Sequence, residues 1–415
     1  MSAIVRLLTH KVSVPLKRPF ITAVRRADAV ELALVEAVDE DGRSGWGEAA
    51  TSWKVTGESP ESVAAAVVDP LGDAVLGHEP DDPALPGLIA RAIWGNVAAR
   101  SAVETAVLDL RAQAAGMSMV TLLKVMATDA ATSPDEIALM SSVLTERKGS
   151  RNGQGNEHIA QMRPALGASS GEDSSTLRRS RRTRAVRTDM TLSAGDPEEL
   201  ARIAAGHVED GFDHIKIKAS RDHDAFAAVS AVRRAVGDEV VLRVDANQAW
   251  TPGEAIAFIQ KSEDAGLGLE FVEQPVAFYD LAGMAKAKAA SHTPIVADES
   301  VRVARDVREL AERGACDQIN VKLAKTGGLC EALAVAGATR KAGMGILVGC
   351  MMEGPIGVSA SAALAAVVSP DRVHDLDAAL WLAETPVAGG ARFVDEAVEL
   401  DEGPGLGIRA LREAA

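Results

Sequence analysis

The chain has 415 residues, and its 44 lysines and arginines against 59 aspartates and glutamates give a formal net charge of −15. An acidic chain repels phosphate backbones and anionic lipid, so we expect no nucleic-acid or membrane partner. Hydrophobic residues make up 47% and charged residues 25% of the chain, a composition that excludes a disordered or fibrous protein. The length exceeds what one hydrophobic core usually serves, so we expect two domains of the α/β class.

Three features of the sequence indicate the compartment. The N-terminus lacks the basic start and the apolar run of a signal peptide. No apolar stretch reaches the roughly 18 residues that span a bilayer. The three cysteines are odd in number and lack metal-ligand spacing, which predicts no disulfide framework. We therefore expect a cytoplasmic protein.

The first 125 residues are predicted to form an α+β domain. Hydrophobic alternation over residues 4–14, 29–38 and 45–48 indicates antiparallel strands. Between residues 60 and 116 the apolar residues recur at helical spacing. Strands followed by helices are typical of a separate α+β unit.

Residues 126–183 fit neither pattern. They are rich in Ser, Gly, Asn and Arg, and they lead into a basic run over residues 178–184. Because such a composition buries little apolar surface, it predicts a flexible surface insertion. A lid, an arm for oligomerisation and a sequence artefact are the alternatives.

Residues 184–384 contain eight short β-branched runs separated by helical segments, and the runs recur at intervals of 24–29 residues. Each strand of a parallel barrel needs a crossover helix of fairly constant length, so this spacing predicts a modified TIM barrel. A doubly wound open sheet is the alternative, but no Gly-rich phosphate loop follows the first run. The runs are 186–192, 214–218, 240–245, 269–273, 294–298, 318–322, 345–349 and 373–377.

Three of these runs end in a carboxylate, namely Asp245, Glu273 and Asp298. The carboxyl ends of barrel strands meet at one mouth, where active sites form. Three anionic side chains from consecutive strands would repel one another unless a hard divalent cation lay between them, which predicts a Mg²⁺ site. Taken singly, each carboxylate is better explained as a capping or loop residue. Their common register favours the metal.

Lysines occupy comparable positions at the mouth. The period of two along a strand places Lys216 and Lys218 on the inner face of the barrel. Lys322, four strands later, reaches the mouth from the opposite side. Two lysines on opposite faces of a metal-bound substrate can exchange a carbon-bound proton, and cationic neighbours together with Mg²⁺ would lower the lysine pKa toward the working pH. For Lys322 alone, a rim lysine paired with an acid is an equally good explanation.

The reaction class follows from this combination of groups. A pair of lysines beside a metal predicts proton abstraction next to a carboxylate, with the metal stabilising an enediolate. Asp375 and Asp377 repeat the period of two with negative charge, and two inward carboxylates beyond the metal set would bind a substrate ammonium. The alternative is a helix N-cap at Asp377 with Asp375 as a loop residue.

Taken together, these motifs resemble the enolase superfamily, muconate-lactonizing subgroup. The resemblance implies a (βα)7β barrel and an N-terminal capping domain, residues 1–125, which the C-terminal tail, residues 385–415, completes. Within the subgroup the chain resembles the dipeptide epimerases, because the acidic pair of the eighth run is followed by Trp381. The family usually has a short link where this chain has residues 126–183. The matching motifs are 211–218, 244–247, 272–275, 297–300 and 320–328.

The resemblance also implies roles for individual residues. Lys218 and Lys322 are the two acid/base catalysts, Lys216 supports the substrate carboxylate, and the strand-end carboxylates bind one Mg²⁺ per subunit. The acidic pair of the eighth run holds the α-ammonium of the substrate.

Two loops of the capping domain resemble those of L-Ala-D/L-Glu epimerases. There an arginine that matches Arg25 binds the side-chain carboxylate of the C-terminal Glu, for which a planar guanidinium is suited. Neighbouring Arg26 could take its place. Thr56, in the second loop, is assigned to substrate binding on the same ground.

The resemblance implies a homo-oligomeric isomerase that epimerises L-Ala-D/L-Glu from cell-wall peptide turnover. Rival enzymes of the subgroup are an N-acylamino acid racemase, an o-succinylbenzoate synthase and a muconate cycloisomerase. A rival of another class is a non-catalytic ligand-binding scaffold.

Overall fold

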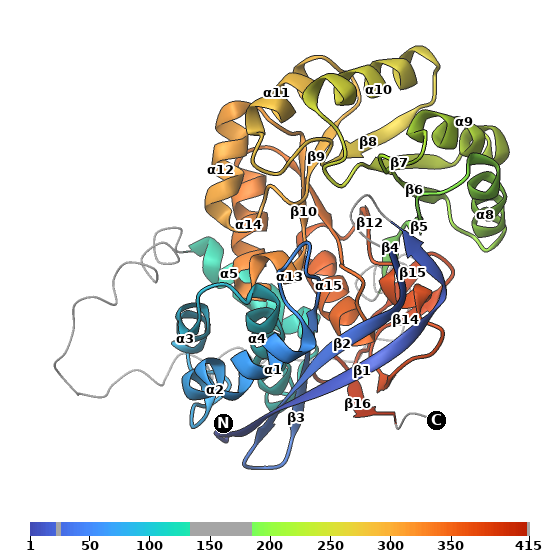
Figure 1. Ribbon diagram of the computed structural model, residues 1–415. Coiled ribbons are helices and arrows are strands. Elements are labelled where there is room, and N and C mark those ends of the chain that lie inside the picture. Colours follow the sequence, from blue (N-terminus) through green and yellow to red (C-terminus); the bar gives the residue numbers. More distant parts are fainter. Residues whose placement is uncertain (22–25, 133–184, 413–415) are drawn as a thin grey trace, which may run out of the picture.

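The computed structural model describes residues 1–21, 26–132 and 185–412 (Figure 1). Within these ranges no helix has the length and apolar character needed to cross a membrane. Arg25 and most of the predicted insertion lie outside the described residues.

The N-terminal region is an antiparallel sheet covered by helices. Strands β1 (Ile4–Ile21), β2 (Arg26–Asp39) and β3 (Ser44–Ala50) pair in that order, and all three are longer than alternation predicted. Helix α4 (Val97–Ala114) packs closely on β3, because a side chain at Gly47 would meet the Ala102 carbonyl oxygen at 1.9 Å. The other helices here are α1 (Pro60–Val68), α2 (Pro70–Val75), α3 (Leu85–Ala92) and α5 (Met119–Thr132).

Helix α5 continues beyond the boundary predicted at residue 126. Residues 126–132 are therefore helical, although the composition of 126–183 predicts a flexible insertion. The remainder of that segment, with the basic run 178–184, lies outside the described residues.

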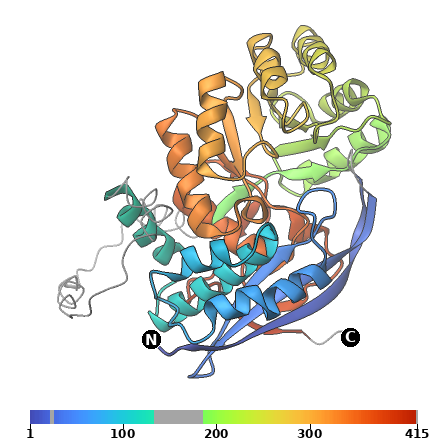
Figure 2. The same ribbon diagram turned by 60° about the vertical axis from the view of Figure 1, so that its left-hand side comes forward.

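The second region is the predicted barrel of parallel strands (Figures 1 and 2). A sheet with the order β11-β10-β9-β8-β7-β6-β5 curls round, β12 pairs with β4, and a bridge between Gly349 and Asp375 joins β11 to β12. The first predicted run is split at Asp189 into β4 and β5. The strands are β4 (Ala185–Thr188), β5 (Met190–Leu192), β6 (His214–Lys218), β7 (Val241–Asp245), β8 (Leu269–Glu273), β9 (Ile295–Ala297), β10 (Gln318–Val321), β11 (Gly345–Val348) and β12 (Val373–His374).

Helices between the strands cover the outside of the barrel (Figure 1). Apolar and charged residues alternate along β6, and this alternation determines which side chains face the helices and which face the barrel interior. Ile215 and Ile217 point outward into the main hydrophobic core, whereas Lys216 and Lys218 point inward. The helices are α8 (Pro197–Glu209), α9 (Ala225–Val236), α10 (Pro252–Asp264), α11 (Leu281–Ala289), α12 (Ala304–Arg313), α13 (Leu323–Thr326), α14 (Leu329–Lys341) and α15 (Pro355–Val368). The fold class predicted from the sequence is confirmed.

The C-terminal tail contacts both regions. Strand β15 (Ala397–Glu399) pairs with β4 of the barrel and with β14 (Arg392–Val394), and β13 (Val387–Gly389) pairs with β16 (Ile408–Leu411). Farther along, Leu406 N donates to Asp109 Oδ1 of α4 at 2.6 Å. The tail thereby links the barrel to the N-terminal helices.

Buried glutamates of the N-terminal region hold the barrel helices at their N-termini. Glu48 of β3 accepts hydrogen bonds from Gly354 N and Gly357 N at the start of α15. Glu104 of α4 accepts one from Cys330 N at 2.8 Å, at the start of α14. Backbone N–H groups at a helix N-terminus favour a negative charge, yet burial raises the pKa of Glu104 to about 7. These contacts fix the N-terminal region over the barrel mouth.

Candidate active site

The carboxyl ends of the barrel strands surround a cavity of about 70 Å³. The N-terminal region contributes Phe20 and Val55 to its wall, so the cavity is built from both parts of the chain. The other lining residues are Thr191, Lys218, Asn247, Asp298, Glu299, Lys322, Cys350, Met351, Met352, Asp375, Asp377 and Ala378.

The three predicted metal ligands lie together. One carboxylate oxygen from each of Asp245, Glu273 and Asp298 lies within 4.8 Å of the other two, and all three side chains are buried. The pairing of β7 with β8 puts Asp245 level with Glu273. Burial, reinforced by Asp245, raises the pKa of Glu273 above its ordinary value, because negative charge is crowded there.

The donor set fits a hard divalent cation. Glu273 Oε2 and Asp298 Oδ1 are buried and find no hydrogen-bond partner within the described part of the chain, although lysine ammonium groups face them at 2.6 and 2.5 Å. Closely spaced carboxylate oxygens are the ligands that Mg²⁺ prefers. The residues present therefore fit the metal that the sequence predicted.

Lys216 lies fully buried at the centre of this cluster. Its Nζ is 2.6 Å from Glu273 Oε2, 2.7 Å from Asp375 Oδ2 and 3.1 Å from Asp245 Oδ2. Burial by itself lowers the pKa of Lys216, but the surrounding carboxylates outweigh burial and raise that pKa well above its ordinary value. The ammonium thus contacts two of the three candidate metal ligands.

Lys218 and Lys322 line the cavity from opposite walls of the barrel. Strands β7, β8 and β9 separate β6, which ends in Lys218, from β10, which Lys322 follows. Lys218 Nζ lies 2.6 Å from Asp245 Oδ2, and Lys322 Nζ lies 2.8 Å from Asp298 Oδ2. This is the arrangement that proton exchange on two faces of one carbon requires.

The lowered lysine pKa expected beside bound Mg²⁺ stays a prediction, and the residues of the chain alone shift the pKa of Lys322 in the other direction. Burial lowers its pKa, but the carboxylates around it, Asp298 first, raise that pKa well above its ordinary value. Bound Mg²⁺ would oppose this effect by offsetting the negative charge of the same carboxylates.

Asp375 and Asp377 both line the cavity and have different partners. Asp375 Oδ2 accepts a hydrogen bond from Lys216 Nζ. Asp377 Oδ2 accepts one from Thr191 N at 2.8 Å and one from Trp381 Nε1 at 3.1 Å. Asp377 stands at the N-cap position of the short helix Ala378–Trp381, as the alternative predicted, but its side chain makes no capping hydrogen bond.

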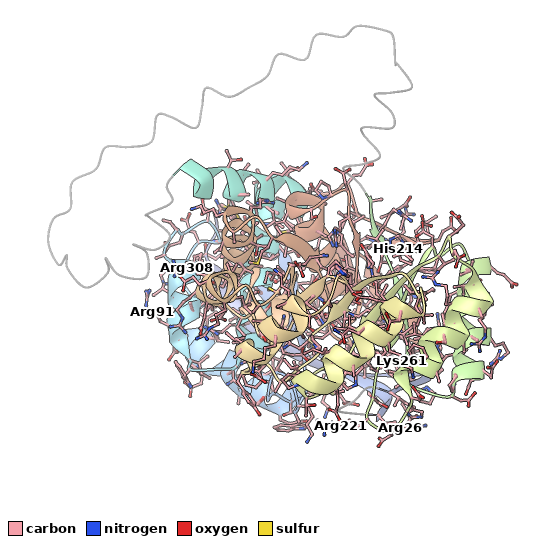
Figure 3. All side chains as sticks on the ribbon, turned by 90° about the horizontal axis from the view of Figure 1, so that it is seen from above. Arg26, Arg91, His214, Arg221, Lys261 and Arg308 are labelled. Carbon is pink, nitrogen blue, oxygen red and sulfur yellow. The ribbon has the colours of Figure 1, made fainter. Side chains whose placement is uncertain are left out.

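The site residues predicted in the N-terminal region are Arg25, with Arg26 as its alternative, and Thr56. Arg25 lies outside the described residues. Arg26 is at the edge of the molecule (Figure 3) and pairs with Asp28 at 3.2 Å. Thr56 does not line the cavity, whereas its neighbour Val55 does, and the Thr56 hydroxyl donates to Ser52 O and accepts from Ser52 N.

Sequence reasoning missed three buried charged residues around the site. Lys325, three residues after Lys322, lies with its Nζ 2.5 Å from Asp298 Oδ1. Glu299 lines the cavity, and burial together with neighbouring carboxylates raises its pKa to about 7. Asp189 lies in the middle of the first predicted strand, two residues before Thr191. The period of two would have placed Asp189 on the inner face.

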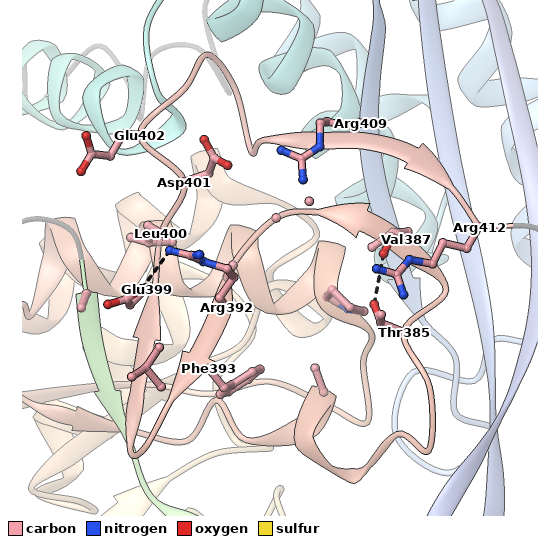
Figure 4. A pocket seen from close by; sticks show the side chains of 17 residues that line it. Thr385, Val387, Arg392, Phe393, Glu399, Leu400, Asp401, Glu402, Arg409 and Arg412 are labelled. Carbon is pink, nitrogen blue, oxygen red and sulfur yellow. Dashed lines mark hydrogen bonds and ion pairs between the residues drawn. The ribbon is translucent and has the colours of Figure 1, made fainter.

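A much larger groove, about 1030 Å³, lies away from these residues (Figure 4). It runs along the C-terminal strands β13 to β16 and is lined by both charges, including Arg392 paired with Glu399 at 3.1 Å. None of the predicted site residues that the structure describes lines it. The volume of a cavity alone therefore does not identify the candidate active site.

Comparison with known families covers most of the chain. Residues 4–124 match the mandelate racemase/muconate lactonizing enzyme N-terminal domain, and residues 199–414 match the enolase C-terminal domain-like family. The L-Ala-D/L-Glu epimerase of Bacillus subtilis (strain 168) is 34% identical over 408 residues, which are 98% of this chain and 96% of that protein.

Solved structures agree with the sequence matches. A substrate-liganded complex of the L-Ala-D/L-Glu epimerase from Bacillus subtilis superposes with a TM-score of 0.82 at 32% identity, covering 99% of this chain and 100% of that one. A dipeptide epimerase from Enterococcus faecalis V583, complexed with Mg and the dipeptide L-Leu-L-Tyr, gives 0.81 at 31% identity over 99% and 100% of the two chains. This chain belongs to the mandelate racemase/muconate lactonizing enzyme family of the enolase superfamily.

Proposed function

We propose that the protein is a Mg²⁺-dependent dipeptide epimerase that inverts the α-carbon of the C-terminal residue, with L-Ala-D/L-Glu as its substrate. The observation that carries the proposal is the pair Lys218 and Lys322, which face one small cavity from opposite walls of the barrel. The relatives named as L-Ala-D/L-Glu epimerases support the same activity.

Asp245, Glu273 and Asp298 would hold the metal. A bound Mg²⁺ would supply Lewis-acid stabilisation of the negative charge that develops on the substrate carboxylate as the α-proton leaves. Lys216 supports that carboxylate with a positive charge. We expect one Mg²⁺ per subunit.

The two lysines carry out the proton transfer. The neutral amine of one lysine accepts the α-proton, and the C–H electron pair passes into the substrate carboxylate as an enediolate. The ammonium of the other lysine then donates a proton to the opposite face of the same carbon, and the reverse reaction exchanges their roles. Lys218 is 9% exposed and Lys322 is 4% exposed, so little water reaches the reacting carbon.

The ammonium-binding pair selects the substrate class. Asp375 and Asp377 place two carboxylates on the cavity wall, which suits the free α-amino group of a dipeptide. The subgroup's N-acylamino acid racemase, o-succinylbenzoate synthase and muconate cycloisomerase substrates carry no such group. The acidic pair therefore favours a dipeptide over those substrates.

The remaining assignments concern substrate specificity, oligomeric state and cellular location. We assign Arg25 to the side-chain carboxylate of the C-terminal Glu. Thr56 takes part in substrate binding by holding the loop that carries Val55, since its hydroxyl bonds Ser52. We also expect a homo-oligomer that acts in the cytoplasm on peptides from cell-wall turnover.

The test is α-deuterium incorporation. The protein is incubated with Mg²⁺ and a library of L,L-dipeptides in D₂O, alongside N-acetylated dipeptides, and the products are measured by mass spectrometry. We expect exchange in L-Ala-L-Glu, no exchange after chelation of the metal, and little in the acetylated set. Exchange confined to acylated substrates would indicate an N-acylamino acid racemase, and no exchange in any compound would indicate a non-catalytic scaffold.

A further inference from the structure

Asp189 is a fully buried carboxylate that the proposed mechanism does not use. It interrupts the first barrel strand, and its backbone N–H donates to His374 O at 2.9 Å. Oδ2 accepts a hydrogen bond from Arg243 Nη1 at 2.7 Å. Oδ1 is buried and has no hydrogen-bond partner in the described ranges. Burial raises the pKa of Asp189 to about 8, because a buried carboxylate with an open acceptor is costly unless a donor can reach it.

The open carboxylate lies beside the ammonium-binding pair. One oxygen each from Asp189, Asp375 and Asp377 lies within 4.8 Å of the other two. Lys216 reaches the same place, since its Nζ bonds Asp375 Oδ2 and the charge of Asp189 acts on it. Its Nζ makes no ion pair with Asp189 within 4.0 Å and contacts Glu273 and Asp245 instead.

The contacts of Lys216 with Glu273 and Asp245 conflict with the proposed metal site. The Lys216 ammonium lies against two of the three carboxylates that would ligate Mg²⁺, and two cations cannot share the same oxygens at contact distance without strong repulsion. Asp377 Oδ2 is already engaged by Thr191 N and Trp381 Nε1. Asp189 Oδ1 is a neighbouring buried acceptor with no hydrogen-bond donor among the described residues.

We propose that Asp189 is a positioning residue for Lys216. When the metal occupies its three carboxylates, Lys216 leaves Glu273 and Asp245, keeps Asp375, and takes Asp189 Oδ1 as its second acceptor. Because Asp189 then shares the charge of Lys216, Asp375 keeps enough negative charge to bind a substrate ammonium. This inference rests on the proposed metal site.

The test is a double-mutant cycle read out by calorimetric titration with Mg²⁺ alone. Asp189→Asn keeps the shape of the side chain and an acceptor for Arg243 but removes the charge. We expect it to weaken Mg²⁺ binding roughly tenfold, as loss of a supporting group beyond the ligands typically does. Lys216→Met should tighten binding, and adding Asp189→Asn to Lys216→Met should then change the affinity less than twofold.

A matched control separates this role from general electrostatics. Glu270 also pairs with Arg243, at 2.6 Å, so Glu270→Gln deprives Arg243 of a carboxylate without touching Lys216. It should leave the Mg²⁺ affinity within about twofold of wild type. If Asp189→Asn lowers the Mg²⁺ affinity equally in the wild type and in the Lys216→Met background, the inference is overturned and the proposed metal site stands.

A crystal structure of the wild-type protein with Mg²⁺ gives a second readout that does not depend on the folding of a variant. Lys216 Nζ within hydrogen-bond distance of Asp189 supports the inference. Lys216 directed elsewhere overturns it. If the wild-type protein binds no Mg²⁺, both this inference and the proposed metal site fail.

Discussion

Lys218 and Lys322 are held on opposite walls of the barrel by different carboxylates. Lys218 Nζ lies 2.6 Å from Asp245 and Lys322 Nζ lies 2.8 Å from Asp298. Both anchoring acids belong to the candidate metal set. Asp245 and Asp298 therefore position the two proposed bases in this structure, and with Glu273 they would also hold the metal.

Removing either lysine should abolish inversion of the α-carbon while leaving exchange of the α-hydrogen in one epimer. We expect Lys218→Gln and Lys322→Gln to lower epimerisation at least about 1000-fold, within the range for loss of a general acid or base. Each variant should still exchange the α-hydrogen of one epimer of the dipeptide in D₂O, and the two variants should retain opposite epimers. Lys261→Gln, on the outer surface (Figure 3), is the control. Retention of the same epimer by both variants would contradict the two-base mechanism.

Mg²⁺ should stabilise the fold through its three carboxylates. At a free concentration of 100 times Kd, binding adds about 2.7 kcal/mol to the free energy of unfolding and so raises the Tm. Glu273→Gln should lose most of this increase, because an amide replaces an anionic ligand. Glu270→Gln, on the same strand, should keep it. Thermal melts with Mg²⁺ and with a chelator measure the difference, and equal increases in both variants would argue against the site.

Asp377 should determine affinity for the free amino group. Asp377→Asn removes one negative charge, and hydrogen bonds to charged groups contribute about 1.5–3 kcal/mol, so KM for dipeptides should rise roughly 10- to 100-fold. Trp381→Phe retains a ring for packing against Phe20 but loses the Nε1 donor, so its KM should rise only about fivefold. The KM for N-acetylated dipeptides should not rise in this way. An unchanged dipeptide KM in Asp377→Asn would remove the ammonium assignment.

Arg25 and its neighbour should differ in their effect on substrate choice. We expect Arg25→Met to lower kcat/KM for L-Ala-L-Glu about 100-fold, since a charge-assisted bidentate contact is lost. The value for L-Ala-L-Leu should change little. Arg26→Met is the matched control, because Arg26 is exposed and pairs with Asp28. A larger effect from Arg26→Met would reassign the specificity contact.

Glu104 should give the fold a pH dependence of known sign. Its pKa in the folded protein is about 7, against an ordinary value of 4.5, so its contribution is fully present below about pH 4.5 and is lost as pH rises toward 7. The unfolding free energy of the wild type relative to Glu104→Gln should therefore fall over this range by up to about 3 kcal/mol. Denaturant titrations at several pH values measure this.

The exposed Glu309, which pairs with Arg313 at 3.0 Å, supplies the control for Glu104. Glu309→Gln should follow the wild type across the same pH range. A Glu104→Gln difference that stays constant with pH would show that burial does not raise the pKa of this carboxyl.

The barrel strands were predictable because their signal is local and repeated. The runs ending at Lys218, Asp245 and Glu273 coincide with the ends of β6, β7 and β8. Residues that end consecutive parallel strands must meet at one edge, so the convergence of the carboxylates followed from spacing alone.

Other features were not predictable because they depend on partners far along the chain. Asp189 bonds Arg243, 54 residues away, and Asp377 bonds Thr191, 186 residues away. The hydroxyl of Thr56 is engaged within its own loop, which the sequence could not distinguish from an open hydroxyl. The pKa of Lys322 depends on how many acids surround it, a number that only the closed barrel determines.

The sequence by itself determined the class of fold, the order of the strands and which residues stand at their carboxyl ends, because side-chain periodicity and crossover length are local properties. Only the tertiary structure decided which buried charge contacts which. Closure of the barrel through β4 and β12 brings the first and last strands together, so that Asp189, Lys216 and Asp375 form one cluster. Electrostatic energies depend on separations of a few ångströms, and the fold, not the spacing along the chain, sets those separations.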